Sequence, residues 1–168
     1  MPPIVLHDVT QRVGWAIANG YSIVTGAALN VDYTAAGEVL RLCPSPSRLT
    51  VMLPTAESIF FAHIRAQAQA NFMGMQVAEV EAVIDQIGKL RQWGANIVEL
   101  PATVCDMQSY DDCHTAILGA ATQLSAFVVD DSQGVLNGVK KAEARNMPVT
   151  LKRYYNRPAT AVREVMEE

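Results

Sequence analysis

The fold is decided by the stretch YSIVTGAALNVD, residues 21–32. Tyr21 to Val24 predict a short buried strand, because aromatic, apolar and β-branched residues dominate it. The small residues Thr25 to Ala28 predict a tight turn, in which a ligand's phosphate or sugar could approach the backbone closely. Asp32 is expected in the first turn of the next helix, where unpaired N–H groups favour a carboxylate. Open α/β sheets bind ligands at such units, although any α/β protein also needs small residues in a tight strand-to-helix turn.

The composition indicates one folded domain. Of the 168 residues, 50% are hydrophobic and 18% are charged, which excludes wholesale disorder and allows a sizeable core. The net charge of −4 argues against a protein built mainly to bind nucleic acid. The sequence has no apolar run of membrane-spanning length and no N-terminal targeting pattern. We therefore expect a cytoplasmic protein without a membrane partner.

Three cysteines, Cys43, Cys105 and Cys113, occur without CxxC spacing. Cys105, Cys113 and His114 fit no common zinc pattern, and buried free thiols are commonplace. The sequence therefore predicts neither a metal site nor a cofactor.

Short apolar strands alternate with amphipathic helices along the chain. Val5, Val9, Val13 and Ile17, for example, recur every four residues and predict a helix to about residue 18. The expected strands are 21–24, 49–53, 96–100, 126–129 and 149–151, with further helices at about 32–42, 57–71 and 77–93, and from about 109 and 135. Strands joined by helices in this way pair in parallel through right-handed crossovers. The prediction is an α/β protein: a Rossmann-like three-layer α/β/α sandwich with a mainly parallel sheet of about five strands.

Two further expectations concern the second half of the chain. Ser109 is expected to cap the helix that follows it, with Asp111 and Asp112 in the first turn. The polar residues from Tyr154 onward, which include Pro158, are expected to form a surface helix or an arm. The predicted organisation is one Rossmann-like domain over residues 1–153 and a C-terminal polar helix or arm over residues 154–168.

Three segments carry a resemblance to a known superfamily. The segment IVTGAALNVD, residues 23–32, resembles a strand followed by the motif S/T-G-G/A-x-x-G-x-D. The segment LTVMLP, residues 49–54, is similar to that superfamily's next strand, and FVVDDSQGVLNGVKKAEARNMPVTL, residues 127–151, resembles its late strand, ligand loop, helix and final strand. Together they resemble the SLOG superfamily, which joins the Smf or DNA-processing protein A fold with the LOG or "lysine decarboxylase-like" proteins. The nearest likeness is to small single-domain proteins similar to DNA recombination-mediator protein A, over about residues 5–152.

The resemblance implies a pocket for a nucleotide or nucleotide-derived ligand at the carboxyl ends of the strands. One side of this pocket would be formed by Thr25, Gly26, Ala27 and Asp32. The other side would be formed at a helix N-terminus, which suits phosphate, by Asp131, Ser132, Gln133 and Gly134. For this second loop, simple capping of the helix by Asp131 or Ser132 explains the residues equally well.

The sequence departs from the SLOG pattern in three places. Asn30 stands where glycine is preferred, so the turn is expected to be less open. The superfamily's first strand precedes the helix that begins here near residue 6, so one wall of the pocket is expected to be missing or supplied by another subunit. The segment QGVLNG, residues 133–138, lacks the threonine and glutamate of the LOG motif P-G-G-x-G-T-x-x-E. The missing carboxylate disfavours cleavage of a glycosidic bond.

The leading hypothesis is a Rossmann-like module that binds a nucleotide-type ligand or phosphate without strong catalysis. One alternative is a LOG-type nucleotide N-glycosidase, or phosphoribohydrolase, that uses Asp32, Asp130 or Asp131 in place of the glutamate, so the sequence leaves open whether the chain is an enzyme. Another is single-strand DNA binding as in DNA-processing protein A, although a solvated helix face explains the basic residues near the C-terminus better. These are Lys140, Lys141, Arg145, Lys152, Arg153 and Arg157.

The chain is also expected to form a homodimer or a higher oligomer. A bare strand edge invites association, and residues 57–93 carry more large apolar groups than one sheet face needs. These groups are Phe60, Phe61, Phe72, Met73, Met75 and Trp93. The interface is expected in this region or in the C-terminal arm, with two-fold symmetry. The alternative is that these side chains pack over the sheet within one subunit.

Overall fold

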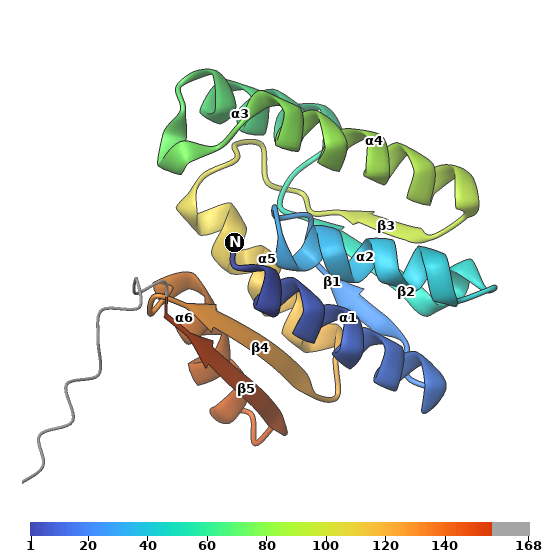
Figure 1. Ribbon diagram of the computed structural model, residues 1–168. Helices are drawn as coiled ribbons and strands as arrows, with labels where there is room; N and C mark the ends of the chain where they lie inside the picture. The colour runs from blue at the N-terminus through green and yellow to red at the C-terminus, as the bar shows by residue number, and fades with distance from the viewer. Residues whose placement is uncertain (156–168) are drawn as a thin grey trace, which may run out of the picture.

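A computed structural model describes residues 1–155, and Figure 1 shows how their elements are arranged. Helices and strands alternate along this range, so the expected α/β class is confirmed. In chain order the elements are α1 (Pro3–Ala18), β1 (Ile23–Thr25), α2 (Val31–Leu42), η1 (Pro46–Arg48), β2 (Leu49–Leu53), α3 (Glu57–Gln69), η2 (Phe72–Gly74), α4 (Val77–Trp93), β3 (Asn96–Glu99), α5 (Met107–Ala120), β4 (Leu124–Val129), α6 (Gln133–Glu143) and β5 (Val149–Tyr154).

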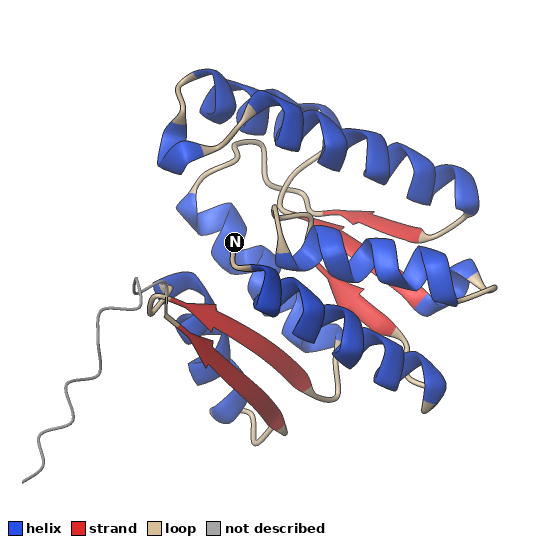
Figure 2. Cartoon of the chain, viewed as in Figure 1, coloured by secondary structure: helices blue, strands red, loops and turns tan. Residues whose placement is uncertain are grey.

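The strands form two parallel sheets rather than the single sheet that was expected. One sheet has the order β1-β2-β3, with Ile23 opposite Leu49. The other contains β4 and β5, with Leu124 opposite Val149. Figure 2 shows the two sheets as separate groups of arrows that point in the same general direction. The division lies between β1 and β4, because each of these strands pairs on one side only within the described residues.

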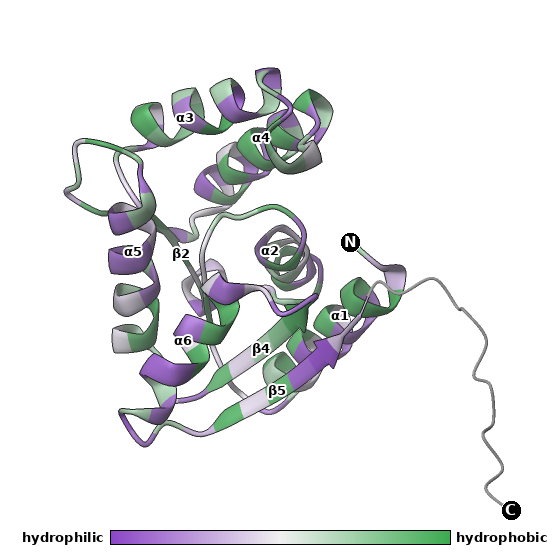
Figure 3. Ribbon diagram, turned by 90° about the vertical axis from the view of Figure 1, so that its left-hand side faces the viewer, coloured by the Kyte–Doolittle hydropathy of each residue, from purple (hydrophilic) through white to green (hydrophobic). Residues whose placement is uncertain are grey.

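Helices cover both faces of the strands. On one side α1 packs against α2 and α2 against α4, whereas α5 contacts β1 and β2, and α6 contacts β4 and β5. Figure 3 shows α1 and α2 on one side of the strands and α5 and α6 on the other. The result is a Rossmann-like three-layer arrangement. Strands β1 to β3 step outward in order, and the chain then returns along α5 to β4, so the topological switch point lies between β1 and β4.

The main core lies between the three-stranded sheet and its helices. Leu49 and Leu53 of β2, Val39 of α2, and Ile87 and Leu90 of α4 are almost completely buried. β2 is buried at four of its five positions, as expected for a parallel strand with a layer of helices on each face. The sequence predicted the bounds of both β2 and α4 correctly.

The start of α5 differs from the prediction. Asp106, not Ser109, is the capping residue: its carboxylate accepts a hydrogen bond from the Ser109 N–H at 2.9 Å. The Ser109 hydroxyl in turn accepts the Asp106 N–H at 2.9 Å, which completes a capping box. The prediction failed because aspartate and serine are equally good capping residues, and both occur at this helix end.

Both ends of the described chain bear on the predictions. The segment from Pro3 to Val5 lies in the first turn of α1 and provides no stub of a preceding strand. β5 continues to Tyr154, one residue into the segment that was expected to form the C-terminal arm. The rest of that segment, residues 156–168, lies outside the described residues. Within residues 1–155 no helix is both long enough and apolar enough to cross a membrane.

Candidate functional site

Asp32 fastens the loop after β1 to the start of α2. Its Oδ1 accepts a hydrogen bond from the Thr25 hydroxyl at 2.6 Å, and its Oδ2 accepts the Ala28 backbone N–H at 3.2 Å. Thr25 is buried at the carboxyl end of β1, and Asp32 lies in the first turn of α2. Hydrogen bonds to an ionised group are the stronger kind, and a helix N-terminus favours negative charge. The carboxylate therefore fixes the path of the turn.

Two backbone features explain residue types in this loop. A Cβ on Gly26 would lie 2.9 Å from Oδ2 of Asp32, so the close approach of the carboxylate requires glycine. Asn30, which replaces the glycine of the SLOG pattern, has φ 70° and ψ −91°. With its negative ψ, Asn30 lies outside the left-handed helical region that asparagine tolerates, in a conformation that is strained for residues with a side chain. Asn30 thus adopts a backbone conformation that glycine would adopt without strain.

The loop after β4 places two successive aspartates in the left-handed region, with φ 47° for Asp130 and 55° for Asp131. The Asp131 carboxylate accepts a hydrogen bond from Arg153 of β5 at 3.0 Å, and its carbonyl accepts one from the Gln133 side chain at 3.0 Å. Ser132 is the N-cap residue of α6, but its side chain makes no capping hydrogen bond. Left-handed residues other than glycine cost about 1–3 kcal/mol each and cluster at ligand-binding loops. The same conformation occurs at Asn71, Met73 and Asn146, so it does not by itself mark this loop as a ligand site.

The two loops meet at one cleft, although they lie far apart in the sequence. The cleft has a volume of about 720 Å³ and lies between β1 and β4, with walls from α1, α2, α5 and α6. The predicted site residues that line it are Thr25, Gly26, Asp32, Ser132 and Gly134. Gly134 has open space where a side chain would project, because a Cβ there would meet nothing within 4 Å.

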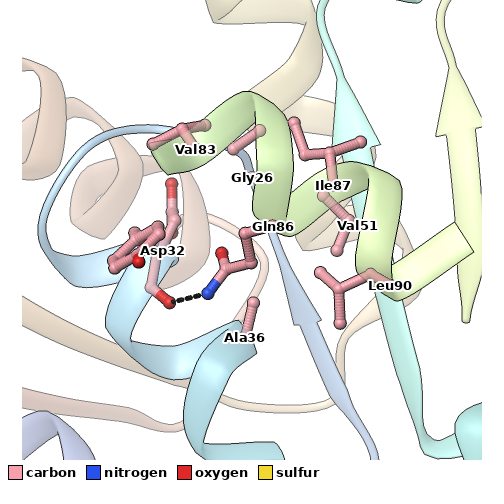
Figure 4. A pocket seen from close by; sticks show the side chains of 10 residues that line it. Gly26, Asp32, Ala36, Val51, Val83, Gln86, Ile87 and Leu90 are labelled. Atoms are coloured by element: carbon pink, nitrogen blue, oxygen red, sulfur yellow. Dashed lines mark hydrogen bonds between the residues drawn. The ribbon is translucent and has the colours of Figure 1, made fainter. Parts of the chain in front are cut away.

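The other predicted site residues lie outside this lining. Asp131 and Gln133 belong to the same loop as Ser132 but do not line the cleft. Ala27 packs against the core and lines a separate void of about 10 Å³ between α2 and α4, shown in Figure 4. Beside this void Gln86 donates a hydrogen bond to the Tyr33 carbonyl at 2.9 Å. A void of this size holds at most about one water molecule, so Ala27 faces no ligand-sized space on this side.

Arg12 and His114 also line the cleft, and the sequence interpretation did not place them in a ligand site. Nε of Arg12 donates a hydrogen bond to the Ser125 hydroxyl of β4 at 2.8 Å, and its guanidinium lies 4.2 Å from the centre of the Trp15 ring. In the sequence Arg12 stands directly before Val13, inside the apolar periodicity of α1. A cation on the buried side of a helix is the signal that could have identified it.

The cysteines do not gather at the cleft. Cys43, Cys105 and Cys113 are buried free thiols. Cys113 donates a hydrogen bond to the Met52 carbonyl at 3.4 Å, and burial raises the pKa of its thiol to about 12. Such a thiol stays protonated at neutral pH and is therefore a poor nucleophile or metal ligand. Its neighbour in the sequence, His114, lines the cleft instead.

Three of the basic residues considered for nucleic-acid binding take part in ion pairs. The pairs join Lys141 to Asp111 at 2.6 Å, Lys152 to Asp8 at 3.0 Å and Arg153 to Asp131 at 3.0 Å. Arg157 lies outside the described residues. These pairs reduce the positive charge that is available to a phosphate backbone.

The chain matches no protein-family model, no curated protein and no solved structure at a significant level. The resemblance to the SLOG superfamily therefore stays a prediction. The case for a function rests on the cleft and on the residues that line it.

Proposed function

We propose that this chain binds a nucleotide or a nucleotide-derived ligand at the carboxyl end of the cleft between β1 and β4. The observation that carries the proposal is the convergence of two strand-to-helix loops, one from Thr25 to Asp32 and one ending at Gly134, on a single cleft. Doubly wound α/β folds bind ligands outside the carboxyl ends of their strands, at the topological switch point. The volume of about 720 Å³ is that of the whole cleft, and the ligand would take its carboxyl end, where the two loops meet.

The polar groups of the cleft support one orientation of such a ligand. A phosphate fits the N-terminus of α6, a helix of 11 residues, because Ser132 does not cap it and Gly134 lets an anion approach. The carboxylate of Asp32 would repel a phosphate and would accept hydrogen bonds from sugar hydroxyls instead. Apolar lining residues such as Ile117 and Val135 offer contacts for a base.

The proposal is tested by titrating the native chain with nucleoside monophosphates, NAD-derived molecules and sugar phosphates, first by thermal shift and then by calorimetry. A ligand at 100 times its Kd stabilises the native state by about 2.7 kcal/mol. For a chain of this size, that free energy raises Tm by roughly 5–11 °C. If none of these compounds binds, the proposal is wrong.

Gly134→Leu tests the location of the site, with Gly88→Leu as the matched control. A Cβ at either position meets nothing within 4 Å, and both glycines lie in helices, where leucine is a better helix former than glycine. Both variants should therefore fold. Only Gly134 lines the cleft, so Gly134→Leu should weaken ligand binding at least tenfold while Gly88→Leu leaves it unchanged. Unchanged affinity in folded Gly134→Leu would refute the site assignment.

Cleavage of an N-glycosidic bond is a second candidate function, and Asp32 is the observation that favours it. Among the described residues, Asp32 is the only carboxylate that lines the cleft, and its two hydrogen bonds hold it in a defined orientation. Such a reaction needs a carboxylate close to the sugar. Release of ribose 5-phosphate from nucleoside monophosphates, lost in Asp32→Asn, would support this candidate. Binding without release would leave ligand binding as the function.

A further inference from the structure

β1 and β4 each leave one edge without a partner strand, and both edges border the cleft. Residues 21–25, which include all of β1, line one side, and Leu124, Ser125, Ala126, Phe127 and Val129 of β4 line the other. No strand pairing joins β1 to β4 within the described residues. An unpaired strand edge presents a row of N–H and C=O groups that can pair with another chain. The cleft is thus bounded by two such rows.

Helices close the cleft on both faces of the strands. Val9 and Val13 of α1 line it on one face, and Ile117 and Leu118 of α5 line it on the other. The space therefore lies in the plane of the two sheets, between two layers of helices. That is the environment of a central strand in a three-layer α/β protein.

Burial on the two bordering strands is incomplete for this environment. β2 is buried at four of five positions, but Ile23 and Val24 of β1 and Phe127 of β4 are only half-buried. Burial of apolar surface is favourable by roughly 25 cal/mol per Å². An apolar element placed in the cleft would complete the burial of these side chains and would be stabilised by it.

We propose that the cleft accepts one extended strand from a partner polypeptide, inserted between β1 and β4 and parallel to both, so that the two sheets become one. This inference rests on the two open edges and not on the proposed ligand, which would lie at the carboxyl end of the inserted strand. The mode of binding is β-strand addition, in which main-chain hydrogen bonds provide affinity and side-chain pockets provide specificity.

The cleft defines the chemistry of the partner segment. The segment has about five or six residues, since β4 has six. Its faces are mainly apolar, to match Val9 and Val13 on one side and Ile117 and Leu118 on the other, with polar positions only where Arg12 and His114 line the cleft. It carries no charge along its middle, where Val24 and Ala126 line the cleft, and it contains no proline, since its N–H groups must pair with both edges.

A second copy of the chain is a less favourable occupant than a different polypeptide. Each described strand of a second copy is already paired in its own sheet, in the orders β1-β2-β3 and β4-β5. Within the described residues, a copy could donate one of these strands only by giving up part of its own fold. An extended segment of another polypeptide has no such cost.

The proposal is tested by tethering a strand-forming segment to the full chain. Met1 lines the cleft, and the N-terminus lies near the carboxyl ends of the strands in Figure 1, so a short Gly/Ser linker suffices for a parallel strand. The probe is a segment of six consecutive valine and isoleucine residues fused through this linker ahead of Met1. Tethering gives an effective concentration in the millimolar range. The matched control has proline at every second position of the segment, which removes every backbone donor toward one of the two edges and prevents the segment from forming a central strand.

Hydrogen–deuterium exchange of the backbone amides is the measurement. In the tethered chain, amides of both β1 and β4 should exchange at least tenfold more slowly than in the native chain, and Tm should rise, whereas the proline control should match the native chain. Unchanged exchange on these strands overturns the proposal, and so does equal protection by the control, which would indicate apolar collapse. Protection of both edges in the native chain also overturns it, because the chain itself or a second copy would then fill the cleft. If the tethered chain does not fold, the segment is added at millimolar concentration as a free peptide to the native chain, and the same readings decide.

Discussion

Replacing Gly26 with alanine tests how the loop after β1 is built. The new Cβ would lie 2.9 Å from Oδ2 and 3.6 Å from Cγ of Asp32, so the carboxylate has to move. Its movement weakens the hydrogen bonds from the Thr25 hydroxyl, at 2.6 Å, and from the Ala28 N–H, at 3.2 Å. Gly26 does not have a positive φ, so alanine meets no backbone strain and the whole penalty is steric.

The expected loss of stability follows from three terms. Overpacking typically costs about 1–3 kcal/mol, and each weakened hydrogen bond about 0.5–1.5 kcal/mol. These two costs overlap, because both arise from the same displacement of the Asp32 carboxylate. A glycine-to-alanine change also lowers the entropy of the unfolded chain, which stabilises the folded state by about 0.4–1 kcal/mol. We expect Gly26→Ala to lower the free energy of unfolding by about 1–2 kcal/mol, and Tm by roughly 2–8 °C.

Urea unfolding in a double-mutant cycle with Asp32→Ala isolates the cause. Once the carboxylate is removed, Gly26→Ala should be neutral or slightly stabilising. Gly88→Ala is the control, because a Cβ at Gly88 meets nothing within 4 Å in α4, and it should not destabilise the chain. An equal loss from Gly26→Ala in both backgrounds would refute the reasoning, since the clash would then not involve Asp32.

Two further predictions concern pH and assembly. The Asp8 carboxylate accepts a hydrogen bond from the Tyr154 hydroxyl at 2.6 Å and forms an ion pair with Lys152 at 3.0 Å. Both contacts hold the pKa of the Asp8 carboxyl below its ordinary value of 3.8. Stability from this group is therefore present above pH 3.8 and is lost as pH falls from there through the lowered pKa. Asp8→Asn should flatten the acid end of a plot of Tm against pH. Parallel curves for the variant and the native chain would contradict this prediction. The second prediction is that the chain forms a homodimer or a higher oligomer. Phe72 and Met73 are 50% and 89% exposed and would contact a partner subunit. Sedimentation equilibrium at micromolar concentration should therefore give a mass above the monomer mass of 18.2 kDa. A clean monomer mass would refute the oligomer.

The positions of the elements could be predicted because their signals are local. In α4 the apolar residues recur at helical spacing, and Gly94, with φ 94°, ends the helix as a glycine in that position should. Pro54 follows directly after β2 and marks its end. The division into two sheets could not be predicted in the same way, because residues such as Val24 and Ala126 show that a strand is apolar but not which strand lies beside it.

The convergence of the two loops could be predicted from similarly local signals. Small residues and polar residues after a strand identify loops such as those of Gly26 and Ser132, and the carboxyl ends of parallel strands bring such loops together. Whether a loop residue faces the cleft depends on how the turn is oriented in the folded chain. The sequence therefore could not show that Gly26 lines the cleft and that Ala27 does not. Arg12 was missed because it reaches the cleft from α1, where the sequence shows only the repeat of buried valines.

The charges on the two sides of the cleft determine how a nucleotide would be oriented under the proposed function. Each oxygen of the Asp32 carboxylate accepts one hydrogen bond from the chain, whereas an ionised carboxylate can accept about four. The acceptor sites that remain suit a pair of sugar hydroxyls, and the same carboxylate repels a phosphate placed beside it. On the α6 side the backbone N–H groups behind Ser132 have no side-chain cap and favour an anion. Asp131, next to Ser132, is paired with Arg153 at 3.0 Å, whereas Asp32 makes no ion pair within the described residues. The reversed orientation would place the phosphate beside the carboxylate without a cation and leave those N–H groups without an anion. Under the proposed function, the two loops would therefore recognise different parts of one ligand, the sugar at α2 and the phosphate at α6.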